Sequence, residues 1–266
     1  MKLSFLPLCV SLAALGAGCW NDLPMFEKPL ETASDRIDGT LPLEGERAIA
    51  LNNSLGSVSL HWGGVEDSIR WGLSRQVTGE NKGDAALLLG AVGLIREFSA
   101  SHDTVRFFAQ APNTIPAYTF QTLISLGVPY DSMSHLIIDG VQGTTDVADL
   151  GTDLRIRNVH AVTVKRLNAS CDILSADGGV NCEVAIPPAG SCVITATHGT
   201  ITLKIPTNTS ANFSAHATNG IVSYSNLAFT GLVQRADSLS GTLGAGNGQI
   251  RLETNEGNIV IQGILP

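Results

Sequence analysis

Apolar residues alternate with polar ones over short segments of this chain, and five pairs of such segments each flank a glycine. An apolar residue stands seven and five places before each glycine, and again two and four places after it. An apolar period of two predicts a strand with one buried face, so each copy predicts a strand, a tight turn and a second strand. The five turn glycines are Gly56, Gly178, Gly199, Gly220 and Gly257.

The spacing of the copies predicts how they pack. Gly178, Gly199 and Gly220 are each twenty-one residues apart, a length that suits one coil of a stacked β-structure. We therefore predict a mainly β fold of stacked strand repeats, similar to a β-solenoid, in which these coils lie on one another. The residues between the apolar positions are mostly Thr, Ser and Asn, so the outward face should be polar and nearly uncharged.

The N-terminal half contains one predicted exception to the β pattern. A short helix is expected over residues 85–89, capped by Asp84 and ended by Gly90. Strands are expected at 94–98, 104–109 and 118–128. We divide the body into an N-terminal β part with the helix, residues 41–134, and a C-terminal β-repeat part, residues 135–266.

The first nineteen residues predict export. Lys2 precedes an apolar stretch over residues 3–15, and small residues at 16–18 precede Cys19. This pattern resembles the lipobox of bacterial lipoproteins, which implies removal of residues 1–18 and a diacylglycerol on Cys19, often with further acylation such as palmitate. An ordinary secretory signal peptide is the alternative.

The resemblance to a lipoprotein also sets the expected location. The protein should lie in the bacterial cell envelope, at the outer membrane or in the periplasm rather than in the cytoplasm, with a membrane as its partner through the lipid. Residues 19–40 lack periodicity and contain Pro24 and Pro29, so we interpret them as a tether.

Charge and side-chain chemistry exclude several function classes. The chain has 24 acidic and 16 basic residues, whereas a nucleic-acid partner requires a clustered basic surface. The six histidines have no metal-ligand spacing, and no cofactor motif is present, so neither a metal nor a cofactor is expected.

Three cysteines remain after export. Cys171 and Cys192 occupy the same inward position of successive coils, which would bring their Cα atoms within disulfide reach. We predict this pair as a disulfide and Cys182 as a free thiol. Three buried thiols that pack as small apolar residues are the alternative.

The chain resembles the bacterial putative-adhesin family of β-strand-repeat domains over about residues 40–263. The strand pairs around glycine, the segment Ser240–Gly244 and the segment Arg251–Ile259 carry this resemblance. It implies the repeat fold and no catalytic or binding residues, because the function of the family is unknown.

Two function hypotheses remain open. The first is a non-catalytic envelope module for binding, adhesion or scaffolding, with an unidentified envelope protein or glycan as its partner. The second is a carbohydrate-active enzyme with paired charged side chains on an outer face, for which Glu183 beside Lys204 is the nearest candidate. We predict the first, without enzyme activity. A deep cleft lined by carboxylates would favour the second.

Overall fold

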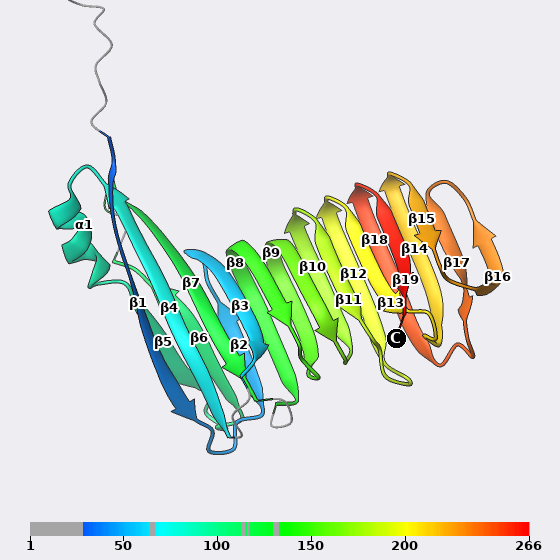
Figure 1. Ribbon diagram of the computed structural model, residues 1–266, viewed down its shortest axis with the longest axis horizontal. Coiled ribbons are helices and arrows are strands. Elements are labelled where there is room, and N and C mark those ends of the chain that lie inside the picture. Colours follow the sequence, from blue (N-terminus) through cyan, green and yellow to red (C-terminus); the bar gives the residue numbers. More distant parts are fainter. Residues whose placement is uncertain (1–28, 64–66, 113–114, 116, 130–132, 266) are drawn as a thin grey trace, which may run out of the picture. The chain divides into compact units, whose positions relative to one another are not determined.

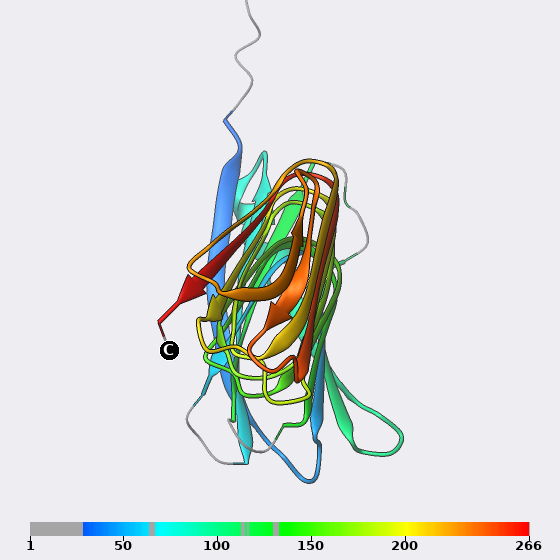
Figure 2. The ribbon, with the colours of Figure 1, turned by 90° about the vertical axis from the view of Figure 1, so that its right-hand side faces the viewer.

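The computed structural model describes residues 29–63, 67–112, 115, 117–129 and 133–265. The chain divides into two units, Met1–Leu30 and Glu31–Pro266, and the helix and strands named below all belong to the second unit. In this unit the strands form a stack of flattened coils (Figure 1). Figure 2 looks along the stack, so successive coils overlap in the view.

The strands form two sheets, which β8 and β9 connect because both strands bend and contribute to each sheet. In β8 and β9 the pairing register shifts between Val141 and Thr144, where the two strands pass from one sheet to the other. The first sheet has the order β1 (Glu31–Pro42), β4 (Ser68–Gly79), β7 (Thr119–Val128), β3 (Gly56–Trp62), β8 (His135–Ala148), β9 (Asp153–Leu167), β11 (Val180–Val184), β13 (Ile201–Pro206), β19 (Ile259–Ile264) and β15 (Val222–Ser225). The second sheet has the order β5 (Gly93–Phe98), β6 (Thr104–Gln110), β2 (Ala48–Asn52), β8, β9, β10 (Cys171–Asp177), β12 (Ser191–His198), β18 (Gly248–Glu256), β14 (Ala211–Asn219), β17 (Ser238–Leu243) and β16 (Phe229–Gln234).

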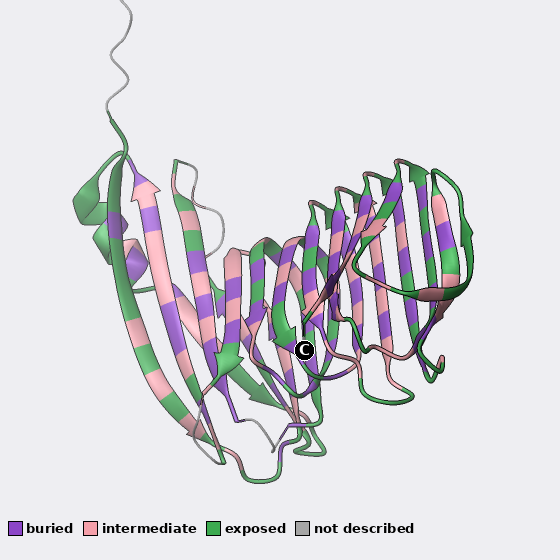
Figure 3. Ribbon diagram, turned by 45° about the vertical axis from the view of Figure 1, so that its right-hand side comes forward, coloured by how far each residue is buried: buried purple, intermediate pink, exposed green. Residues whose placement is uncertain are grey.

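The predicted alternation is confirmed in the packing. One apolar cluster runs through the space between the two sheets, from Ile49 in β2 to Ile261 in β19, and it crosses residue 135, where we divided the body into two parts. Buried and exposed positions alternate along most strands (Figure 3). Of the predicted inward positions, only Tyr224 is partly exposed, because it lies in the short β15 at the end of its sheet. The fold class predicted from the sequence is therefore correct.

The order of the coils differs from the prediction. The coil of Gly199, β12 and β13, contacts the coil of Gly257, β18 and β19, and the coil of Gly220 lies on the far side of the latter. After β15 the chain makes a hairpin, β16 and β17, and then returns between two coils already formed. Residues 227–248, which interrupt the repeat spacing, form this hairpin and the connection back to the stack.

The turn glycines satisfy two different requirements. Gly178, Gly199 and Gly257 adopt positive φ values of 107° to 139°, a region that favours glycine. Gly56 and Gly220 are not among the positive-φ glycines. At these two positions a Cβ atom would lie 2.0 Å from the carbonyl oxygen of Thr122 and 1.8 Å from that of Gly257, respectively. Close approach of the neighbouring coil therefore requires glycine there.

Two local predictions need correction. The predicted tether over 19–40 is wrong for residues 31–40, which belong to β1 and pair antiparallel with β4. Most of β1 is exposed, since it is the edge strand of the first sheet, so its apolar alternation is weak in the sequence. The helix α1 spans Lys82–Leu89 and begins three residues earlier than predicted. Its cap is Asn81, not Asp84, and the Asn81 side chain accepts a hydrogen bond from the amide of Gly83.

Candidate functional site

The predicted lipidation site lies outside the described residues. Cys19 and the predicted signal segment, residues 1–18, belong to the part of the chain that the structure leaves undescribed. Within the described residues, no helix has the length and apolar character needed to span a membrane.

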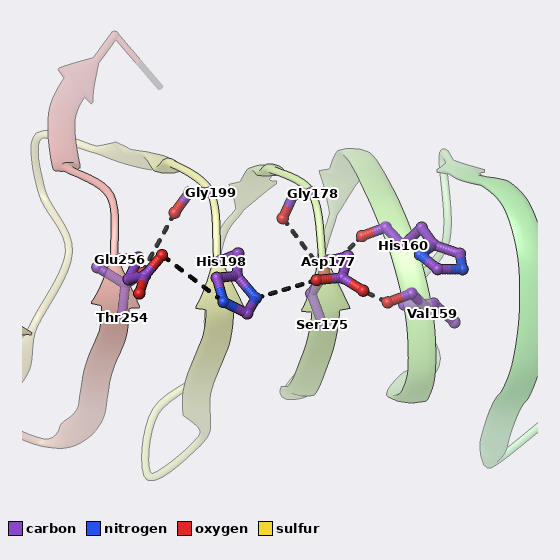
Figure 4. A network of polar contacts seen from close by, with 9 residues as sticks. All are labelled: Val159, His160, Ser175, Asp177, Gly178, His198, Gly199, Thr254 and Glu256. Carbon is purple, nitrogen blue, oxygen red and sulfur yellow. Dashed lines mark hydrogen bonds and ion pairs between the residues drawn. The ribbon is translucent and has the colours of Figure 1, made fainter.

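The turns at one end of the coils carry a row of polar side chains, shown in Figure 4. The parallel register places Asp177, His198 and Glu256 side by side on β10, β12 and β18. The His198 Nδ1 atom lies 3.0 Å from Asp177 Oδ1, and its Nε2 atom lies 3.6 Å from Glu256 Oε2. More than half of each side chain is exposed. We expect a weak contribution to stability, as for most exposed ion pairs.

Hydroxyl groups beneath this row complete the turns rather than forming a catalytic set. The buried Ser175 hydroxyl donates a 2.5 Å hydrogen bond to the carbonyl oxygen of His160, and the Thr254 hydroxyl donates one of 3.2 Å to that of Gly199. Ser175, His198 and Asp177 are residue types of a hydrolase triad, but the Ser175 hydroxyl contacts backbone carbonyls instead of the imidazole. The row of Asp177, His198 and Glu256 therefore has a structural role and is not a hydrolase triad.

The cysteines are adjacent, as predicted, but the disulfide is not formed. Cys171 and Cys192 are register partners on β10 and β12, and all three cysteines are free and buried. The Sγ atoms of Cys171 and Cys192 lie 3.2 Å apart, which is a thiol hydrogen bond rather than a bond of about 2 Å. Hydrogen bonds with Cys182 and Cys192 lower the pKa of Cys171, whereas the hydrogen bond with Cys171 and burial raise the pKa of Cys182. None of these sulfurs is accessible enough to serve as a nucleophile.

Neither the metal nor the charged pair considered from the sequence gives a catalytic arrangement. No group of three or more His, Cys, Asp or Glu residues in the described ranges could hold a metal ion. Glu183 and Lys204 are opposite one another on β11 and β13, yet they form no ion pair within 4.0 Å.

A hollow of about 650 Å³ lies on the outer face of the second sheet. Its lining includes polar and charged side chains that can form hydrogen bonds. It also includes a partly apolar wall. The lining residues are Ala50, Leu51, Asn52, Glu97, Ser99, Thr104, Arg106, Phe108, Ile137 and Asp139. We call this depression the second-sheet hollow.

The register explains why a hollow forms at this place. Ala50 lies on β2 between Arg106 of β6 and Ile137 of β8, so a methyl group faces outward between two long side chains. One pair further along the same strands, Asn52 lies between Phe108 and Asp139. Ala50 and Asn52 of β2 therefore form the floor of the hollow. Side chains of the neighbouring strands β6 and β8 form its walls.

The electrostatics of the second-sheet hollow are mixed. Arg106 provides a cation, whereas Glu97 and Asp139 provide carboxylates. The Asp139 Oδ1 atom accepts a 2.8 Å hydrogen bond from the side-chain amide of Asn158, which fixes its orientation. Such a surface offers both donors and acceptors to a polar ligand.

A profile of the Toastrack DUF4097 family matches residues 130–262, half of the chain. The chain belongs to the Toastrack family. No curated protein matches it in sequence. The resemblance to a putative-adhesin family of unknown function is thus confirmed at the level of family.

The chain is also similar to several solved structures, at low sequence identity and with TM-scores below 0.5. A putative cell adhesion protein from Clostridium sporogenes is 11% identical, with a TM-score of 0.45, over 87% of this chain and 100% of that one. A putative adhesin from Bacteroides fragilis is 9% identical (TM-score 0.31; 86% and 97% covered). A putative lipid binding protein from Parabacteroides distasonis is 10% identical (TM-score 0.31; 86% and 97% covered).

Sequence analysis of the Toastrack chain did not find the second-sheet hollow. Its residues come from four strands and from Ser99 in the loop after β5, and two of these strands, β5 and β6, were predicted without their pairing partners. The available signal was the small Ala50 at an outward strand position, where larger residues are usual. This signal identifies a hollow only when the neighbouring strands are known.

Proposed function

We propose that this chain is a non-catalytic binding module of the bacterial cell envelope, held at a membrane by a lipid on Cys19. The second-sheet hollow carries the proposal, because it combines a volume of about 650 Å³ with convergent polar groups and an apolar wall. The ligand class that suits it best is a neutral glycan. The apolar faces of a sugar ring would pack on Phe108 and Ile137, and its hydroxyls would bond with Asp139, Asn52 and Arg106.

The spacing of the carboxylates supports binding rather than glycoside hydrolysis. Glu97 on β5 and Asp139 on β8 are separated by β6 and β2, which are three steps of about 4.8 Å between strands. The two strands are thus roughly 14 Å apart, and Asp139 lies two residues beyond Ile137, which shares the row of Glu97, so the two carboxylates do not face each other in one row. In glycosidases the catalytic carboxyl groups lie about 5 to 9.5 Å apart. The Asp139 carboxylate also accepts a hydrogen bond from Asn158, so one of its oxygens is already occupied and is not free to act as an acid or nucleophile.

Calorimetric titration of the full chain with a panel of neutral envelope oligosaccharides tests this function. Ala50→Leu fills the floor of the second-sheet hollow, so it should weaken binding at least tenfold. Ala161→Leu makes the same change at an outward position of β9 in the first sheet and should leave binding unchanged. No binding to the panel, or equal affinity of both variants, would contradict the proposal. Release of new reducing ends during the titration would instead support the enzyme hypothesis.

A further inference from the structure

A second hollow, of about 430 Å³, lies on the outer face of the first sheet, away from the second-sheet hollow. The register places Asp38, Gly72 and Ser125 in one row across β1, β4 and β7. Arg70, Gly127 and His61 lie in the next row, on β4, β7 and β3. We call this depression the first-sheet hollow.

Two glycines at outward positions form its floor. A Cβ atom on Gly72 would lie 2.4 Å from Asp38 Oδ1 and 2.6 Å from Arg36 Nη2, so both of these side chains lean over Gly72. A Cβ atom on Gly127 would lie 3.0 Å from the Cα atom of Gly63, 3.5 Å from Arg70 Cβ and 3.7 Å from His61 Nε2. Gly72 and Gly127 are thus buried beneath charged side chains that come from three strands, and these side chains face the hollow.

The charges around this floor favour an anion. Arg36, Arg70 and His61 line the hollow, and Asp38 is the one carboxylate among its described lining residues. Asp38 is already paired, since its Oδ1 atom accepts a 2.8 Å hydrogen bond from Arg36 Nε. Arg70 forms no hydrogen bond or ion pair with any residue in the described ranges.

One carboxylate, that of Asp149, competes with a bound anion for His61. The pKa of the Asp149 carboxyl is lowered mainly by its hydrogen bond with Arg166 and to a smaller extent by the charge of His61. The Asp149 carboxylate is satisfied by two hydrogen bonds from Arg166, at 2.5 Å and 2.6 Å. Asp149 therefore competes only partly with an anion at His61.

We propose that the first-sheet hollow binds a phosphoryl group, with Arg70 and His61 as its main contacts and Arg36 at the rim. A guanidinium donates paired hydrogen bonds to the oxygens of such a group, and two guanidiniums with an imidazole around one hollow suit an anion with several oxygens better than a neutral ligand. This site is separate from the second-sheet hollow, and it does not depend on the glycan proposal.

Titration calorimetry of the full chain at low ionic strength tests the site with two probes, inorganic phosphate and glycerophosphoglycerol. Arg70→Gln removes a main cationic contact of the proposed site and should weaken binding of the preferred probe at least tenfold. Lys204→Gln removes the same charge from the same sheet, on the distant β13, and should change the affinity less than twofold. Tighter binding of inorganic phosphate identifies a free phosphate as the ligand, and tighter binding of glycerophosphoglycerol identifies a phosphodiester headgroup.

Gly72→Val tests the floor while every charge is kept. The three atoms nearest to an added Cβ atom belong to the ends of the flexible Asp38 and Arg36 side chains, so the strand should tolerate the change while the hollow fills and binding is lost. Because Trp71 also lines the hollow, the tryptophan fluorescence should respond to the probe in the wild type but not in Gly72→Val. Absence of saturable binding for both probes, or equal weakening by Lys204→Gln and Arg70→Gln, overturns the proposal.

Discussion

At the scale of single residues, the side of the sheet on which a residue lies decides its energetic role. Ile201 and Leu203 on β13 are fully buried, and Thr202 between them is partly exposed. Burial of an aliphatic side chain stabilises a fold by roughly 1.5 to 3 kcal/mol, whereas a partly exposed threonine contributes little. One residue of displacement along the strand therefore exchanges a core position for a surface position.

The first prediction compares these two positions. Ile201→Asp loses the burial energy and places a carboxylate in an apolar core, at a further cost of several kcal/mol, so the C-terminal coils should unfold or lose most of their stability. Thr202→Asp makes the same new side chain at an outward position and should change the free energy of unfolding by less than about 0.5 kcal/mol. Chemical denaturation of both variants measures the difference. Equal stability, or the reverse order, would show that the faces are assigned wrongly.

At the scale of the strands, local patterns in the sequence were sufficient for the elements but not for their neighbours. Alternation around each turn glycine predicted both strands of a copy, because burial of one face leaves a period of two. It did not predict that β18 and β19 insert between two earlier coils, since the inward residues of all coils are alike. Both hollows escaped prediction for the same reason: Ala50 and Gly72 leave space only in relation to strands that are distant in sequence.

The second prediction concerns the attachment of β1, which the sequence did not reveal. Asp35 of β1 accepts hydrogen bonds of 2.6 Å and 2.8 Å from Arg75 of β4, and these bonds lower the pKa of the Asp35 carboxyl. A lowered pKa in the folded state stabilises the protein above the unfolded pKa of about 3.9, and this stability is lost as the pH falls through the folded value. Asp35→Asn should thus cost between about 0.2 and 1 kcal/mol at pH 7 and nothing at strongly acidic pH.

Denaturant unfolding of the wild type and Asp35→Asn between pH 2 and 7 measures this dependence. Asp38→Asn is the matched control, since Asp38 pairs with Arg36 within β1 and joins no other strand. A difference between wild type and Asp35→Asn that persists unchanged to pH 2 would rule out the proposed charge contribution.

The third prediction concerns the thiols that connect two neighbouring strands. We expect Cys171 and Cys192 to form a disulfide when the unfolded chain, in which the thiols are accessible, refolds with oxidised glutathione. The glutathione takes up the two protons and two electrons, and the two sulfurs lie in contact in the folded state. In the chain-entropy model this bridge stabilises the fold by roughly 3 kcal/mol. Peptide mapping without reduction should find the bridge in the wild type and in Cys182→Ser but not in Cys192→Ser. A bridge that contains Cys182 would contradict the prediction.

At the scale of the whole molecule, the apolar cluster joins coils that are far apart in sequence, while the chemistry proposed for binding lies on the two outer faces. The second-sheet hollow and the first-sheet hollow lie on different sheets, so each can be altered without direct contact with the other. A module with two ligand faces is most useful where it is held at a surface, which is the role that we propose for the lipid on Cys19.

The last prediction tests this anchor. Small residues at Gly16, Ala17 and Gly18 precede Cys19, a pattern that resembles the lipobox of bacterial lipoproteins. Two or three acyl chains hold a protein stably at a bilayer, because each buried methylene contributes about 0.8 kcal/mol. Cells given an alkyne fatty acid should therefore label the wild type and place it in the membrane fraction, and Cys19→Ser should lose both the label and the fractionation. Cys9→Ser, a change to a cysteine within the predicted signal segment, serves as the control and should keep both. Labelling that survives in Cys19→Ser, or a mature N-terminus at any other residue, would mean that the chain is exported without this lipid.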